Sequence, residues 1–317
     1  MVESRTARSP ILVPKSAPIL ATDLDGTLIP LPPQEPSDAS KKTADSGDPI
    51  GEESSRLQRS ALRRLQQLVD AGSLEILFVT GRHLASILEV IRRESLPTPD
   101  WIIGDVGTTV LQRRPEGAYR VMEAYVNHLD EIAGDLRAAE VRCEVEDMDG
   151  LVLQEPEKQG LHKLSFYCDA GEVERLEVGL QQRLVERSIR YRVVASVDPF
   201  TNDGLIDLLP IGVDKAAAIR WWSETQGHPP DTIIFAGDSG NDFAALTAGY
   251  RAVLVGNADP ALADRVRRHH DSAGTAERFY HASGFATAGV WEGLIHFTGI
   301  EPDGDRRAEA TGARPLS

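Results

Sequence analysis

Short apolar runs and amphipathic segments alternate along most of the chain. Runs such as Leu74–Val79 are long enough for buried strands and too short for helices. Between them, apolar residues recur at the spacing of one helix face, as at Leu57, Ala61 and Leu65. This order predicts an α/β fold in which a Rossmann-like parallel sheet carries helices on both faces. Its predicted strands are 19–23, 74–79, 101–105, 109–111, 205–209, 232–236 and 251–255, and its predicted helices are 56–71, 84–91, 214–222, 243–248 and 288–297.

The pattern changes between residues 122 and 205. Helices and strands alternate closely there, which predicts a small α+β domain inserted into the larger one. The predicted domains are therefore a core at 18–121 and 206–300 and an inserted domain at 122–205. Within the insertion we expect helices at 126–139 and 173–184 and strands at 141–145, 163–168 and 189–195.

Three segments lack hydrophobic periodicity. Residues 1–17 predict a flexible arm and residues 301–317 a flexible tail. Residues 30–55 are rich in Pro, Ser, Asp and Lys and predict a flexible insertion. Because this insertion begins beside the first strand, a lid over the end of that strand is the alternative to an unstructured loop.

The composition narrows the classes of function. The 317 residues are 41% hydrophobic, enough for a real core, and the net charge of −15 argues against nucleic acid as a partner. The chain has no apolar run near the ~18 residues that cross a membrane, and its N-terminus lacks the apolar core of a signal peptide. We therefore expect a soluble, cytoplasmic protein with no membrane partner. Cys143 and Cys168 lack metal-ligand spacing and predict two buried thiols.

Chemically active side chains follow the first predicted strand. Asp23 and Asp25 are two residues apart at its end, so the side chain of one and the backbone of the other can face one cation. A hard ion such as Mg2+ prefers oxygen ligands of this kind. Gly26 allows a sharp turn, and Thr27 is expected to hold Asp25 across it. By itself, this stretch is equally compatible with an ordinary strand and an Asp-Gly turn.

Two later strand ends carry complementary groups. Thr80 and Gly81 lie between a strand and a helix, where free N–H groups can bind phosphate, although Thr80 alone would also fit a helix N-cap. Asp238 and Asp242 flank a Gly-Asn turn after another strand. Parallel strands end at one edge of their sheet, so these acids should converge with Asp23. Converging carboxylates repel one another, which indicates a bound cation.

Lys215 is the candidate positive charge of the protein itself. It lies at a strand-to-helix junction. In the sequence it stands between Thr80-Gly81, the predicted phosphate seat, and the pair Asp238 and Asp242. There it could neutralise a phosphate and an attacking carboxylate, whereas a lysine near a helix start is otherwise only solvated.

The segments around Asp23, Thr80, Lys215 and Asp238, in this order along the chain, resemble the motifs of the haloacid dehalogenase-like (HAD) phosphatase superfamily. The inserted domain resembles its type IIB cap. The resemblance implies that Asp23 is a nucleophile that forms an aspartyl-phosphate. It implies that Asp25 is the general acid and then the general base. The segments that carry the resemblance are Asp23-Leu24-Asp25-Gly26-Thr27, Thr80, Lys215 and Gly237-Asp238-Ser239-Gly240-Asn241-Asp242.

The resemblance also implies a magnesium cofactor. Mg2+ would be held by the Asp23 side chain, the Asp25 carbonyl and Asp238, with Asp242 in support. The phosphoryl oxygens would be held by Thr80 and Lys215. The full set of predicted substrate-binding residues is Thr80, Gly81, Lys163, Lys215 and Asn241, with Asn202 and Asp207 as weaker candidates and a surface strand position as the alternative for Lys163.

Within the superfamily, the chain is most similar to sucrose-phosphate phosphatase. This sequence departs from the family in three ways. The family often has Asn at the position of Gly26 and Gly at that of Ala216, and an insertion like 30–55 is unusual in it. The resemblance implies hydrolysis of sucrose 6-phosphate, and the open alternatives are trehalose 6-phosphate, mannosyl-3-phosphoglycerate, phosphohexomutase activity and a non-catalytic partner of a sugar-phosphate synthase. A synthase is also a candidate partner of an active enzyme. The similar segments are 99–103, 163–167, 207–210, 237–242 and 288–297.

Overall fold

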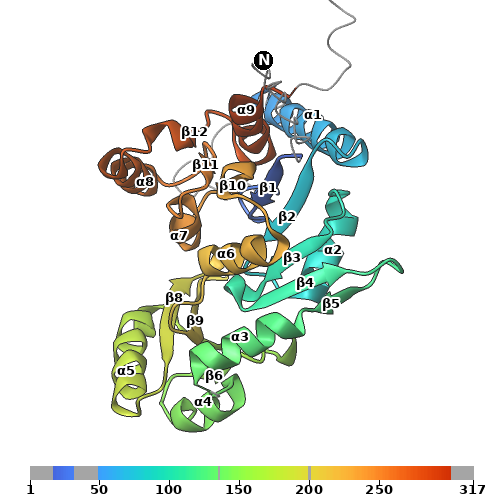
Figure 1. Ribbon diagram of the computed structural model, residues 1–317. Coiled ribbons are helices and arrows are strands. Elements are labelled where there is room, and N and C mark those ends of the chain that lie inside the picture. Colours follow the sequence, from blue (N-terminus) through green and yellow to red (C-terminus); the bar gives the residue numbers. More distant parts are fainter. Residues whose placement is uncertain (1–16, 32–48, 135, 199–200, 301–317) are drawn as a thin grey trace, which may run out of the picture.

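The computed structural model of the chain describes residues 17–31, 49–134, 136–198 and 201–300, which form two sheets (Figure 1). The main sheet has the order β12-β11-β10-β1-β2-β3-β4-β5. Its strands run parallel from β12 to β3, and β4 and β5 are antiparallel additions. The strands are β1 (Ile19–Thr22), β2 (Glu75–Val79), β3 (Trp101–Gly104), β4 (Thr109–Arg113), β5 (Tyr119–Val121), β10 (Ile233–Gly237), β11 (Arg251–Leu254) and β12 (Phe279–His281).

Helices cover both faces of the main sheet, as predicted. Ile19 and Ala21 of β1 point into one apolar core, and Leu20, between them, points into the other. This alternation is what a strand buried on both faces requires. The first core contains residues of α6 (Lys215–Gln226), α7 (Phe243–Leu246) and α8 (Pro260–Ala273), and the second contains residues of α1 (Pro49–Asp70), α2 (Leu84–Glu94) and α9 (Ala286–Thr298).

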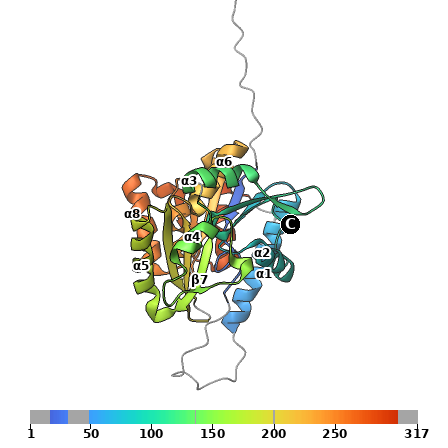
Figure 2. The same ribbon diagram turned by 90° about the horizontal axis from the view of Figure 1, so that it is seen from below.

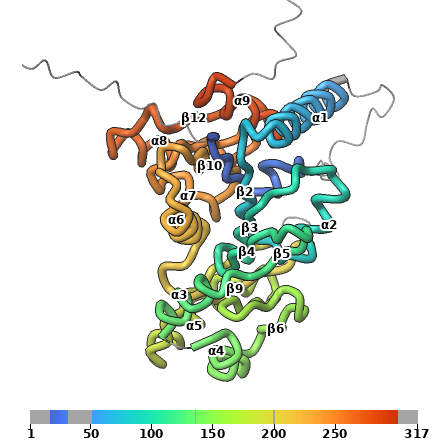
Figure 3. The backbone as a smooth tube through the Cα atoms, turned by 45° about the vertical axis from the view of Figure 1, so that its right-hand side comes forward, coloured from blue at the N-terminus to red at the C-terminus, as the bar shows by residue number. Residues whose placement is uncertain are grey.

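The inserted α+β unit lies at the bottom of the view in Figures 1 and 3, below the main sheet. Its antiparallel sheet has the order β6-β7-β9-β8. The unit has its own apolar core, and α3 connects it to the main sheet: the rings of Tyr125 on α3 and Trp221 on α6 lie 4.7 Å apart, and Figure 2 shows these helices side by side. The elements are α3 (Glu123–Ala133), α4 (Ala138–Val145), β6 (Val152–Leu153), β7 (Leu164–Asp169), α5 (Val173–Glu186), β8 (Tyr191–Val197) and β9 (Asp203–Pro210).

The prediction that residues 205–209 return to the main sheet was wrong. These residues belong to β9, which pairs with β7 and β8 in the inserted sheet. Ile206 and Leu208 are fully buried in the core of the inserted unit. A period of two predicts a strand but does not say which sheet will bury its apolar face, so the domain boundary at 205/206 cuts through β9.

Two predictions at the start of the insertion were also wrong. The helix expected at 126–139 ends at Ala133, because Gly134 takes the left-handed backbone (φ 73°) that terminates a helix. The strand expected at 141–145 is part of α4, which buries Ala138, Val141 and Val145. This spacing of three and four residues marks one face of a helix, which the short apolar run concealed.

The structure changes two further predictions. Helix α1 begins at Pro49, so the end of the predicted flexible insertion 30–55 is helical. Residues 32–48 lie outside the described part of the chain, as do residues 1–16 of the predicted arm and the tail 301–317. Cys143 is exposed, contrary to prediction, and Cys168 is buried. Among the described helices, none is long and apolar enough to cross a membrane.

Candidate active site

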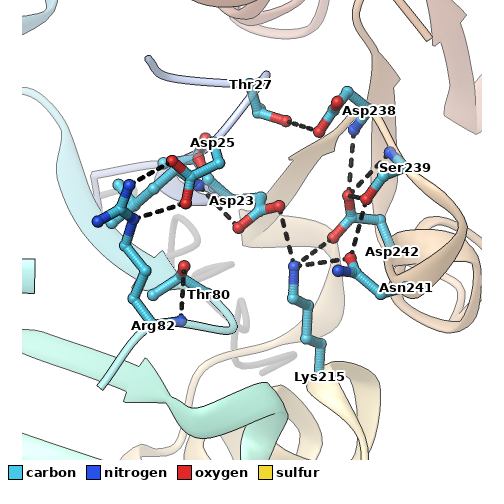
Figure 4. Close-up of polar contacts among 12 residues, drawn as sticks. Asp23, Asp25, Thr27, Thr80, Arg82, Lys215, Asp238, Ser239, Asn241 and Asp242 are labelled. Carbon is cyan, nitrogen blue, oxygen red and sulfur yellow. Dashed lines mark hydrogen bonds and ion pairs between the residues drawn. The ribbon is translucent and has the colours of Figure 1, made fainter. Parts of the chain in front are cut away.

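Three parallel strands deliver the predicted residues to one edge of the main sheet (Figure 4). Asp23 follows β1, Thr80 follows β2 and Asp238 follows β10. Thr22, the last residue of β1, is in register with the next-to-last residues of β2 and β10. The strand ends therefore meet, as the positions of their polar residues predicted.

Asp23 is almost fully buried and its side chain is fixed. Its Oδ1 accepts a hydrogen bond from the backbone N–H of Leu24 at 2.8 Å. Its Oδ2 lies 3.0 Å from the ammonium of Lys215. Burial raises the pKa of Asp23 to about 7, and Lys215 offsets only part of this effect. The arrangement holds one carboxylate oxygen and leaves the other beside a positive charge.

Lys215 is fully buried and joins three segments of the site. Its ammonium contacts Asp23 Oδ2 at 3.0 Å and donates to Asp242 Oδ1 at 2.7 Å and to Asn241 Oδ1 at 3.0 Å. Burial by itself would lower the pKa of Lys215, but the carboxylates of Asp23 and Asp242 outweigh it and raise the pKa. Lys215 is therefore a permanent cation at the centre of the site.

The backbone brings Lys215 to this position at the start of α6. Asp214 caps the helix by accepting a hydrogen bond from the N–H of Ala217 at 2.8 Å. Gly107, with φ 95°, approaches the preceding loop so closely that an added Cβ would lie 2.4 Å from the carbonyl oxygen of Asp214. A side chain at position 107 would displace the lysine.

Asp242 organises the third strand end. Its Oδ2 accepts hydrogen bonds from the backbone N–H groups of Asp238, at 3.1 Å, and Ser239, at 3.2 Å, while its Oδ1 accepts from Lys215. Both oxygens are thus engaged by the protein. Burial, with Asp242 beside it, raises the pKa of Asp238 to about 6.

The turn at Gly26 packs against Asp238, a contact that the sequence did not predict. Thr27 donates its hydroxyl to Asp238 Oδ1 at 2.8 Å, so it holds Asp238 and not Asp25 as predicted. Gly26 has φ 75°, and an added Cβ would lie 2.2 Å from Asp238 Oδ2. Asn257, absent from the predictions, donates to the Gly26 carbonyl at 2.8 Å. No sequence pattern around Asn257 distinguished it.

The predicted phosphate seat is held by a strained turn. Thr80 is buried, and its hydroxyl oxygen accepts from the Arg82 N–H at 3.2 Å, which leaves the hydroxyl hydrogen to donate elsewhere. Asp105 and Val106 take left-handed backbone angles (φ 51° and 58°) and donate their N–H groups to the carbonyls of Arg82 and Thr80.

Helix α2 begins at Leu84 after His83, so Thr80 is not its N-cap. Gly81 has room for a side chain.

The remaining predicted substrate residues divide between two places. Asn241 lies beside Asp242, and its Oδ1 accepts a hydrogen bond from Lys215. Lys163 belongs to the inserted unit, where it is buried and lies 3.7 Å from Asp207 Oδ1. Its burial contradicts the alternative of a surface strand residue. Asn202 is exposed in a turn between β8 and β9.

Arg82 is the main charged residue of the site that sequence reasoning missed. It forms a bidentate ion pair with Asp25, with 2.6 Å from Nε to Oδ2 and 2.6 Å from Nη2 to Oδ1. A cation directly after the Thr80-Gly81 pair was a usable signal, but nothing local pointed to Asp25, which is distant in sequence.

The acidic side chains fit a magnesium ion. Asp23, Asp238 and Asp242 each offer one carboxylate oxygen, and these oxygens lie within 4.8 Å of one another. All three are hard oxygen donors of the type that Mg2+ prefers. The pKa values of Asp23 and Asp238 are raised because these carboxylates are buried close to one another and Lys215 neutralises only part of their charge.

Comparison with known proteins identifies the family. The family model described as sucrose-6F-phosphate phosphohydrolase matches residues 16–298, nearly the whole chain. The chain belongs to this family. It is therefore a HAD-type phosphoric monoester hydrolase, as its motifs predicted.

Individual relatives agree with this assignment. A HAD-like hydrolase of Nitrosococcus oceani is 34% identical over 88% of this chain and 71% of its own length. Mannosylfructose-phosphate phosphatase of Agrobacterium fabrum is 29% identical over 90% of this chain and 98% of its own length. The structure of the Synechocystis sucrose-phosphatase in complex with sucrose and phosphate is 24% identical, covers 88% of this chain and 97% of that one, and has a TM-score of 0.61, which supports the shared fold.

The raised pKa of Asp23 predicts an unusual pH dependence of stability for the metal-free protein. Between the ordinary value of 3.8 and about 7, the folded state binds more protons at Asp23 than the unfolded state. The free energy of unfolding must therefore fall as the pH rises through this window. The variant Asp23→Asn lacks this effect, so in EDTA the Tm of the wild type should drop relative to that of Asp23→Asn between pH 5 and pH 8.

Differential scanning calorimetry of both proteins checks this prediction. We expect a relative drop of several degrees, because 1 kcal/mol shifts the Tm of a large domain by roughly 2–4 °C. Added Mg2+ should reverse the drop at pH 8. A constant difference in Tm across the pH range would contradict the burial effect on Asp23.

Proposed function

We propose that the protein is a Mg2+-dependent phosphatase that hydrolyses a disaccharide phosphate or a similar sugar phosphate through an aspartyl-phosphate, with sucrose 6-phosphate as the best single candidate substrate. The observation that carries the proposal is the pairing of Asp23 with the buried Lys215 at 3.0 Å, beside Thr80. One oxygen of Asp23 is thereby held at the position from which it would attack a phosphoryl group, and Lys215 would neutralise the charge of that group.

The proposed reaction has two steps with opposite proton transfers. In the first, Asp23 bonds to phosphorus, the bond from phosphorus to the sugar oxygen breaks, and Asp25 gives that oxygen a proton. In the second, Asp25 takes a proton from water as the water oxygen bonds to phosphorus and the bond to Asp23 breaks. Lys215 and the Thr80 hydroxyl hold the phosphoryl oxygens in both steps.

Mg2+ would be held by the Asp23 side chain, the Asp25 carbonyl and Asp238. When bound, it supplies positive charge that stabilises the phosphoryl oxygens. Asp242 supports this set indirectly, because both of its oxygens already accept hydrogen bonds from Lys215 and from the N–H groups at 238 and 239.

The inserted unit, redrawn to include β9, is the candidate type IIB cap. Its position below the edge of the main sheet would let it cover the sugar and exclude water from the leaving group (Figure 1). Lys163, directly before β7, and Asp207 on β9 lie close together and are the candidate sugar contacts. Lys163 is buried and Asp207 is partly exposed, and their ammonium and carboxylate groups can donate to and accept from sugar hydroxyls.

The relative from Agrobacterium fabrum favours mannosylfructose phosphate as a second candidate substrate, because that protein is named for it and aligns over 98% of its own length. Both candidates are phosphorylated disaccharides. The choice between them therefore depends on the sugar contacts and not on the catalytic cluster.

A substrate panel with and without Mg2+ tests the proposal. The panel consists of sucrose 6-phosphate, mannosylfructose phosphate, trehalose 6-phosphate and the monosaccharide derivative mannosyl-3-phosphoglycerate. Phosphate release should be highest with one of the three disaccharide phosphates, and EDTA should abolish it. An equal response to all of them would contradict a disaccharide substrate. Isomerised product from hexose 1-phosphate and a bisphosphate, without free phosphate, would indicate a mutase.

A further inference from the structure

Arg82 lies next to the phosphate seat but contacts the carboxylate of Asp25. Its Nε and Nη2 each donate to one oxygen of Asp25 at 2.6 Å, and Nη1 donates to Ser86 Oγ at 2.6 Å. The hydrogen bond to Asp25 raises the pKa of Arg82. Figure 4 shows the guanidinium on the side of Asp25 away from Lys215. The two cations thus pair with different carboxylates: Lys215 with Asp23 and Asp242, and Arg82 with Asp25.

The backbone of Arg82 is fixed as firmly as its side chain. Its N–H donates to Thr80 Oγ1 at 3.2 Å, and its carbonyl accepts from Asp105 N–H at 3.0 Å. Ser86, one helical turn further along, holds the third nitrogen of the guanidinium. A planar guanidinium held at this many points imposes one orientation on a carboxylate that binds both of its prongs.

We propose that Arg82 is a positioning residue that holds the Asp25 carboxylate in the orientation from which it accepts a proton from the attacking water. This inference rests on the proposed phosphatase function. Both oxygens of Asp25 accept hydrogen bonds from Arg82, as the carboxylate form requires. This is the form that Asp25 has after it has given its proton to the leaving oxygen. One guanidinium contact must open for each proton transfer, while the other keeps the carboxylate in place.

The proposal separates two substrates with different leaving groups. A sugar oxygen needs a proton as it leaves, whereas p-nitrophenolate leaves without one. Hydrolysis of the aspartyl-phosphate needs the base in both cases. Loss of correct Asp25 positioning should therefore slow both steps with a sugar phosphate, but only the second step with p-nitrophenyl phosphate.

The test is rapid-quench and stopped-flow kinetics of Arg82→Ala and Arg82→Lys with Mg2+. With the sugar phosphate, kcat of Arg82→Ala should fall by roughly 10²-fold while KM stays nearly constant, which is the range of general acid–base effects. With p-nitrophenyl phosphate, the same variant should release about one equivalent of p-nitrophenolate at the wild-type rate and then stall. Arg82→Lys should recover part of the turnover, because lysine makes a single contact.

Arg93→Ala is the matched control, since Arg93 lies on α2 and pairs only with the surface acids Glu89 and Glu94 in the described structure. It should behave as wild type. A raised KM on both substrates with loss of the burst would show that Arg82 binds the phosphoryl group, and would overturn the proposal. Unchanged kcat in Arg82→Ala would overturn it as well. A wild type inactive on both substrates would instead refute the proposed phosphatase function.

Discussion

Replacing Asp23 by Asn is expected to abolish phosphate release, with a fall in kcat of ~10⁴-fold or more, because no other group can form the covalent intermediate. The fold should survive. An Asn side chain at this position can still accept the hydrogen bond from Leu24, and Lys215 keeps Asp242 and Asn241 as partners. Steady-state phosphate release on the preferred sugar phosphate and circular dichroism on the same sample check both parts.

Asp264→Asn is the matched control for this variant. Asp264 lies exposed on α8 and pairs with Arg267 at 3.4 Å, so the same chemical change there should leave turnover and Tm unaltered. Full activity of Asp23→Asn would show the nucleophile assignment to be wrong. Trapping of 32P on the wild type but not on the variant would give direct evidence for the aspartyl-phosphate.

Replacing Lys215 by Met is expected to damage both catalysis and stability. The ammonium is fully buried between Asp23 and Asp242, and its removal leaves two carboxylates facing each other without a protein cation. Breaking a buried ion pair in this way costs about 3–5 kcal/mol of folding free energy. The loss of charge opposite the phosphoryl oxygens should reduce kcat by a further ~10²–10³-fold.

Urea unfolding in EDTA and in Mg2+ measures the effect of Lys215→Met on stability. The loss should be largest in EDTA and smaller in Mg2+, because a divalent ion shields the same carboxylates. Lys158→Met, which removes a half-exposed lysine from the inserted unit, should change the free energy of unfolding by only a few tenths of a kcal/mol in either condition. An unchanged midpoint in Lys215→Met would show that the ion pairs contribute nothing to stability.

The positions of the site residues could be predicted because each one follows an apolar strand. Local hydrophobicity is enough to recognise a strand such as β1 or β10, and parallel strands of one sheet necessarily end at the same edge. Asp23, Thr80 and Asp238 meet for this reason. Lys215 was predicted from its position at a helix start and not by this argument, because the strand before it, β9, belongs to the inserted sheet.

Contacts across the sheet could not be predicted in this way. Thr27 was expected to hold Asp25 but bonds to Asp238, more than two hundred residues away in the sequence. Asp25 is held instead by Arg82. Each hydroxyl or charge had several partners of suitable chemistry, and only the packing of β1 against β2 and β10 selected among them.

The sequence by itself determined the alternating elements, the two-sided burial of the main sheet and the residues that its strand ends present, because these depend on periods of two and of three to four residues. Tertiary structure alone decided that β9 joins the inserted sheet and that residues 141–145 form a helix. It also decided that Lys215 pairs with Asp23 and Arg82 with Asp25. These outcomes depend on which apolar faces and charges are left to pair once the chain is compact, and that choice is made between residues far apart in the sequence.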